Sequence, residues 1–150
     1  MGRFLDLRVS ENSSTFGVVP VTTVSTVPAL AGVIGLQTQG VAGTGTNGLI
    51  VNLTGTVGAQ NSNEVSATVI INVQRGSATF GAGPIIYTAE HQVVAGATNL
   101  ITFNAIDLNA PAAAETVYAM FISANSAAIV ARTGPESFSG VSQNGLAATP

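Results

Sequence analysis

The sequence predicts an all-β protein, a jelly-roll β-sandwich of about eight strands that carries an extended N-terminal arm. Val, Ile and Thr, which favour strands, are common, and Gly, Ser and Asn, which favour turns, recur between them. Apolar residues alternate with polar ones at period two, and turn signals follow one another at short, even intervals. Of the 150 residues, 46% are hydrophobic but only 5% are aromatic, so we expect one domain with a core of small and β-branched side chains.

The arm takes up residues 1–12 and is the predicted assembly element. Leu5, Leu7 and Val9 alternate with Phe4 and with charged residues, which is the pattern of a half-buried strand. We expect the arm to leave its own domain and to complete the sheet of a neighbouring copy, docking through Phe4, Leu5, Leu7 and Val9. Pairing of the arm with its own sheet is the alternative that the pattern leaves open.

The jelly-roll domain is expected to span residues 13–150, and its first part is the least regular. Between residues 15 and 36 the chain is largely apolar and free of charge, but Pro20 and Pro28 divide it into short or edge strands. Residues 37–48 are rich in Gly and Thr, which predicts a loop or a flexible pair of strands.

Clear strands follow, each bounded by turn residues. Alternating apolar positions predict four of them, at residues 49–57, 65–74, 84–94 and 100–108. Turns are expected between them, for example around Asn61 and Gly96.

Further strands are expected toward the C-terminus. The first occupies residues 116–124, and two shorter ones occupy residues 127–131 and 137–141. The run Thr133-Gly134-Pro135 predicts the turn between these two. Residues 144–150 are expected to be a loose tail or a short last strand.

Few side chains are suited to catalysis or to metal binding. His91 is the only histidine and follows Glu90 in an expected strand, so the two side chains point to opposite faces. Asp107 is expected at a strand end, where it accepts hydrogen bonds from backbone amides. No second carboxylate stands at a spacing typical of acid–base catalysis, no Gly-x-Ser-x-Gly motif occurs, and cysteine is absent. We expect no enzyme activity, no metal site and no cofactor.

The charge balance excludes some partners and favours another. The chain has four basic residues, all arginine, and a net charge of −3, so it cannot form a basic surface for nucleic acid. No stretch of 18 apolar residues predicts a membrane span, and the charged start lacks the apolar region of a classical signal peptide. With so few charges, copies of the chain repel each other weakly, which favours a homopolymer.

Four segments carry a resemblance to a known family. They are VNLTGTVG at residues 51–58, FNAIDLNAP at 103–111, VYAMF at 117–121 and GPESFSG at 134–140. With these segments, the chain from residue 49 to its end resembles the jelly-roll subunits of bacterial endospore appendages. It also resembles the related C-terminal domains of exosporium filament glycoproteins.

The resemblance implies a structural subunit of a self-assembling fibre on the outer surface of a spore or cell. In that family an amino-terminal connector docks into neighbouring subunits, and some members lock the joint with cysteines, which this chain lacks. The resemblance therefore implies a non-covalent helical filament joined by donated strands. It also implies an anchoring protein at the surface as a partner, and release without a classical signal peptide.

Two other functions fit the same fold prediction. One is a closed trimer of the C1q/tumour-necrosis-factor kind, which would act as a binding head. The other is a viral capsid or tail component. A small oligomer of fixed mass would distinguish the trimer from a fibre.

Overall fold

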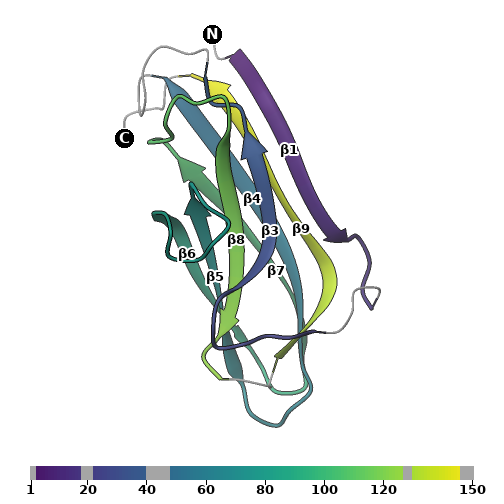
Figure 1. Ribbon diagram of the computed structural model, residues 1–150. Helices are drawn as coiled ribbons and strands as arrows, with labels where there is room; N and C mark the ends of the chain where they lie inside the picture. Colours follow the sequence, from purple (N-terminus) through teal and green to yellow (C-terminus); the bar gives the residue numbers. More distant parts are fainter. Residues whose placement is uncertain (1–2, 18–21, 40–47, 127–129, 146–150) are drawn as a thin grey trace.

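The computed structural model is an all-β sandwich of two antiparallel sheets (Figure 1). It describes residues 3–17, 22–39, 48–126 and 130–145, and no helix occurs among them. The strands are β1 (Arg3–Ser13), β2 (Thr22–Thr23), β3 (Ala29–Leu36), β4 (Leu49–Asn61), β5 (Ala67–Arg75), β6 (Ile85–Val93), β7 (Thr98–Asp107), β8 (Thr116–Ala124) and β9 (Val130–Asn144).

The order of the strands is that of a hairpin rolled up on itself. One sheet has the order β1-β9-β4-β7, with the short β2 also paired to β9, and the other has the order β3-β8-β5-β6. Apart from β2, the first strand pairs with the last, the next with the one before the last, and so on inwards. This pairing is the jelly roll, so the predicted fold class is confirmed.

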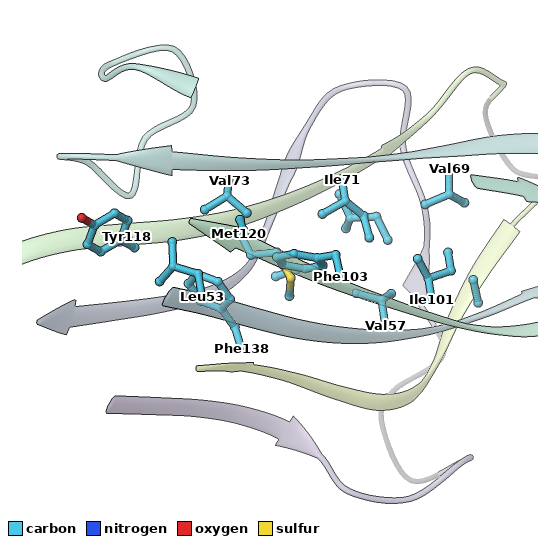
Figure 2. Packing of buried hydrophobic residues seen from close by; sticks show 14 of the residues in the cluster. Leu53, Val57, Val69, Ile71, Val73, Ile101, Phe103, Tyr118, Met120 and Phe138 are labelled. Atoms are coloured by element: carbon cyan, nitrogen blue, oxygen red, sulfur yellow. The ribbon is translucent and has the colours of Figure 1, made fainter. Parts of the chain in front are cut away.

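The core lies between the two sheets and is built mainly from Val, Ile, Leu and Ala (Figure 2). Aromatic rings occupy its middle, where Phe103 stacks on Tyr87 with centroids 5.3 Å apart and lies 6.4 Å from the ring of Phe138. Met120, fully buried, fills the space beside Phe103, as Figure 2 shows. Since large rings are few, the remaining volume is filled by the alternating small residues that the sequence predicts.

The long strands agree with the alternation in the sequence, with shifted ends. The strand expected at residues 49–57 extends to Asn61, and the one expected at 65–74 starts at Ala67 because Val65 lies in an exposed turn. The apolar stretch from 15 to 36 yields β2 and β3. The expected loop at 37–48 is described only in part, and Pro20, residues 127–129 and most of the expected C-terminal tail lie outside the described residues.

The C-terminal strand corrects one prediction. The turn expected at Thr133-Gly134-Pro135 is wrong, because β9 runs without interruption from Val130 to Asn144. The register between β4 and β9 slips between Val57 and Ala59, opposite the predicted turn. The turn-forming residues are therefore accommodated in a β-bulge, which bends the strand without ending it.

Gly58 is required at this bulge. A Cβ atom on Gly58 would lie 1.8 Å from the carbonyl oxygen of Gly134, a backbone atom that no side-chain rotation can move away. We expect Gly58→Ala to lower the free energy of unfolding by about 3 kcal/mol, the upper part of the range for overpacking. Urea denaturation measures this loss. Gly145→Ala is the control, since its Cβ would lie 3.6 Å from the nearest side-chain atom; equal stability of both variants would contradict the prediction.

Candidate assembly surface

The N-terminal segment is the edge strand of the β1-β9-β4-β7 sheet. β1 pairs with β9 of the same chain, from Arg3 opposite Asn144 to Ser13 opposite Glu136. Figure 1 shows β1 (purple) lying along β9 (yellow) over its whole length. This corrects the expectation that residues 1–12 leave the domain as an exchanged arm. The alternative, pairing with its own sheet, is the arrangement that the structure has.

The inner face of β1 explains why the strand stays with its own chain. Near one end, the carboxylate of Asp6 accepts a hydrogen bond of 3.0 Å from the backbone amide of Gln37. Near the other end, the side-chain amide of Asn12 donates to the carbonyl of Ala31 at 2.9 Å and to the buried carboxylate of Glu136. These polar contacts hold one end of β1 to the residue that follows β3, and the other end to β3 and β9.

The expected docking residues lie on different faces of β1. Phe4, Leu7 and Val9 are 63%, 52% and 62% exposed, whereas Leu5 is partly buried and packs against the core. The register of β1 slips between Phe4 and Asp6, so Leu5 is the extra residue of a bulge and turns inward. Leu7 and Val9 therefore share the outward side with Phe4. The prediction that Leu5, Leu7 and Val9 lie on the same side of the strand is therefore wrong for Leu5.

We call the side of the β1-β9-β4-β7 sheet that faces away from the other sheet the outer face. The paired strands give the rows Leu7–Val141–Asn52–Ile106 and Val9–Ser139–Thr54–Asn104 across it. The paired strands place on this face Phe4, Leu7, Val9, Glu11, Ser137, Ser139, Val141, Gln143, Ile50, Asn52, Thr54, Thr56, Gln60, Thr98, Leu100, Thr102, Asn104, Ile106 and Ala131.

Charge is nearly absent from the outer face. Glu11 is the only ionisable residue in the set just given. Apolar residues gather at one end, where the row through Leu7 is flanked by Phe4 and Ile50. Hydroxyls and amides cover the rest, and some of them bond to each other, as Thr54 and Ser139 do at 2.7 Å. A partner covering this face would have to desolvate few charged groups.

The other sheet does not offer an equivalent surface. The loop between β5 and β6, residues 76–84, folds over its outward side. The fully buried side chain of Gln74 donates to the carbonyls of Ser77 and Thr79 at 2.9 and 2.8 Å, which holds this loop in place. Phe80, in the loop, meets Phe121 of β8 edge to face with centroids 5.2 Å apart. This loop buries Phe121 on the side of the sheet that points away from the core.

Asp107 fastens the two sheets together and has a structural role. It accepts a hydrogen bond from the backbone amide of Asn109 at 2.8 Å, as predicted, but also pairs with Arg75 of β5 at 2.7 Å and with the Tyr118 hydroxyl at 2.9 Å. The two last partners are not evident in the sequence because they come from the opposite sheet. Burial, together with the charge of Asp107 and its hydrogen bond, raises the pKa of Tyr118 well above its usual range.

The described residues offer little for catalysis or metal binding. No group of three or more His, Asp or Glu side chains that could hold a metal ion occurs among them. Two hollows of about 360 Å³ each are lined in part by Arg75, whose guanidinium is neutralised by Asp107. His91 is half-buried in β6, on the side opposite to its neighbour Glu90. In the part of the chain that the structure describes, no helix has the length and hydrophobicity to cross a membrane.

Comparison with known proteins supports the fold. No protein-family model matches the chain, and no curated protein matches it. Among solved structures, the VP2 subviral particle of infectious bursal disease virus is similar at 11% identity and a TM-score of 0.52, covering 94% of this chain and 32% of that chain. The Eiger TNF protein from S. frugiperda is similar at 12% identity and a TM-score of 0.44, covering 100% and 96%.

The similarity to the VP2 particle supports the fold alone, since the identity is low. The chain spans between 32% and 36% of the length of three of the capsid chains that it matches.

Asp6 links the pairing of β1 to pH. Burial alone would raise the pKa of its carboxyl, but hydrogen bonds from the Gln37 amide and from Arg8, and the charge of Arg8, outweigh burial and hold the pKa below its ordinary value of 3.8. The stabilisation is therefore present above pH 3.8 and is lost as the pH falls through the lower, folded-state pKa. We expect the difference in unfolding free energy between the wild type and Asp6→Asn to be largest near neutral pH and to shrink in acid. Chemical denaturation across the pH range measures it; a constant difference would contradict the assignment.

The Arg75–Asp107 pair yields a second prediction. We expect Asp107→Asn to cost about 3 kcal/mol, because it leaves a largely buried guanidinium without its carboxylate. Tyr118→Phe removes one hydrogen bond to the same carboxylate and should cost only about 1–2 kcal/mol. Urea midpoints of the two variants, compared with the wild type, test this order. If Asp107→Asn were the milder change, the proposed link between the sheets would be wrong.

Proposed function

We propose that this protein is a structural subunit that assembles non-covalently with copies of itself into an extracellular fibre, with the outer face as a contact surface. The observation that carries the proposal is the near absence of charge from the outer face, where Glu11 is the only ionisable residue. Charged groups are what monomeric β-proteins use to keep an exposed sheet soluble and separate. A face that lacks them is suited to being covered.

The dimensions of the outer face agree with this role. Four strands about 4.8 Å apart, with about ten residues each at about 3.3 Å, outline roughly 600 Å² before the relief of the side chains is counted. A specific protein interface buries about 800 Å² on each partner. The outer face is thus close to the size of one complete interface. Its apolar end, around Leu7, Val141 and Ile106, supplies the hydrophobic part of such a contact.

The place of assembly follows from the resemblance of residues 49–150 to endospore appendage subunits. On that basis the fibre belongs to the surface of a spore or cell, where an anchoring protein holds its base. The lack of cysteine is compatible with joints made only by packing and hydrogen bonds. β1 pairs with its own sheet. The subunits would therefore join through contacts between complete sandwiches and not through an exchanged N-terminal arm. The protein needs no catalytic group for this function.

Lysines on the outer face test the proposal. Asn104 and Ile106 are exposed on β7, so Asn104→Lys with Ile106→Lys should fold normally and yet fail to assemble. The wild type should form filaments visible by negative-stain electron microscopy, and the variant should sediment as a small species. The matched control is Val27→Lys with Val65→Lys, which adds the same charge at exposed positions outside the outer face and should leave the filaments intact.

Two outcomes would contradict the fibre. Filaments of normal length from the outer-face variant would show that this surface is not a contact. A wild-type oligomer of small, fixed mass in light scattering would favour a closed binding head of the C1q/tumour-necrosis-factor kind over a fibre.

A further inference from the structure

We infer that the free edge of β1 pairs with β1 of a second copy, antiparallel and about a two-fold axis at Leu7. The two sandwiches then share one continuous sheet. The inference rests on the proposed function and names one contact within the assembly. It is carried by the sequence of charges along β1 and by the state of its free edge.

Among the strands that the structure describes, none lies beside one edge of β1. The other edge pairs with β9, and β1 stands at the end of the strand order in its sheet. The backbone amide of Leu7 donates to Oδ1 of Asp6 at 2.9 Å and not to β9, so it lies on the free edge. In the proposed pair this amide would leave Oδ1 and donate to the Leu7 carbonyl of the other copy. The register slips of β1 lie near its two ends, which leaves Asp6–Glu11 as a regular segment between them. About a two-fold axis at Leu7, residues Asp6–Arg8 of the two copies lie opposite each other within this segment.

The charges on β1 are self-complementary. If two copies pair about Leu7, Asp6 of each copy lies directly opposite Arg8 of the other. Asp6 and Arg8 already form an ion pair within the chain, with 3.0 Å between Oδ2 and Nε. In the pair of strands the four charges then alternate in sign both along and across the ladder. Opposite charges placed directly across an antiparallel ladder stabilise it, and like charges destabilise it. Arg8 is well exposed and has further donors for this purpose.

The apolar residues of β1 match in the same register. Leu7 lies beside Leu7 of the other copy on the outer face, and Val9 comes opposite the bulge at Phe4 and Leu5. These side chains, which are exposed in the single chain except for Leu5, would cover one another.

The other three edge strands do not share this property. β3 has no charged residue, β6 has Glu90 as its only carboxylate and no arginine, and β7 has only Asp107, which pairs with Arg75. Charges on an edge strand commonly prevent association. That effect requires charges of one sign, or an order that brings like charges together, whereas Asp6 and Arg8 bring unlike charges together in an antiparallel pair about Leu7.

Single cysteines test the register, because the chain has no cysteine of its own. In the proposed pair the two Leu7 Cα atoms are about 5.5 Å apart, which is within reach of a disulfide. Leu7→Cys should therefore give a covalent dimer under mild oxidation, visible on a non-reducing gel. Val9→Cys is the matched control: it is equally exposed, but its two copies would lie about 13 Å apart along the strands and should not cross-link.

Charge variants test the complementarity independently. Arg8→Asp places Asp6 opposite an aspartate and should weaken self-association of β1 about tenfold or more. An equimolar mixture of Arg8→Asp and Asp6→Arg chains should form mixed dimers by analytical ultracentrifugation, although neither chain does so alone. Far-UV circular dichroism of each variant checks that it is folded.

The outcomes separate this inference from the proposed function. Cross-linking of Leu7→Cys but not of Val9→Cys supports the pair. If both cysteine variants cross-link equally, or if neither does, the proposed β1 pair is wrong. Wild-type filaments that still form would then leave the fibre in place. Cross-linking of Leu7→Cys but not of Val9→Cys, together with a wild type that forms no filaments, supports the pair and overturns the fibre.

Discussion

The architecture depends on β9, which pairs along both of its edges. On one edge it joins β4, and on the other it joins β1 and the short β2. Its inward side chains include Glu136, which the side chains of Asn12 and Arg132 contact, and Phe138, against which the backbone of Gly32 packs. β9 therefore decides both where β1 lies and which of its sides turns to the core. The exposure of Leu7 and Val9 follows from that pairing.

Period-two alternation in the sequence is sufficient to predict β4, β5, β7 and β8, because each of these strands turns one face to the core. It failed where a bulge intervenes. The bulge at Leu5 moves one residue from the outer to the inner side, and the bulge opposite Gly58 keeps Thr133-Gly134-Pro135 within a strand. Bulges arise from the register between strands that are distant in sequence, so local pattern does not reveal them. For the same reason the partners of Asp107 were not evident.

The few charges of this chain are used mainly for internal attachment. Arg8 pairs with Asp6, Arg75 with Asp107 and Arg132 with Glu136, so three of the arginines are bound to carboxylates of the same chain. Two of these pairs are largely buried: Arg75–Asp107 joins the two sheets, and Arg132–Glu136 lies at the bend of β9. Ionic groups that fix the fold internally leave the broad surface neutral. A chain with little charge can thus combine a specific fold with a nearly neutral outer face.

The loop at residues 76–84 makes the two broad sides of the sandwich unequal. It seals Phe121 beneath Phe80 and turns its own tip to solvent at Gly81, whose φ of +80° suits a glycine turn. If subunits assembled through the outer face, each subunit would expose this loop tip to solvent on its opposite side. Peptides inserted there would be displayed as a regular array without disturbing the joints, which makes the loop a natural point for variation among such proteins.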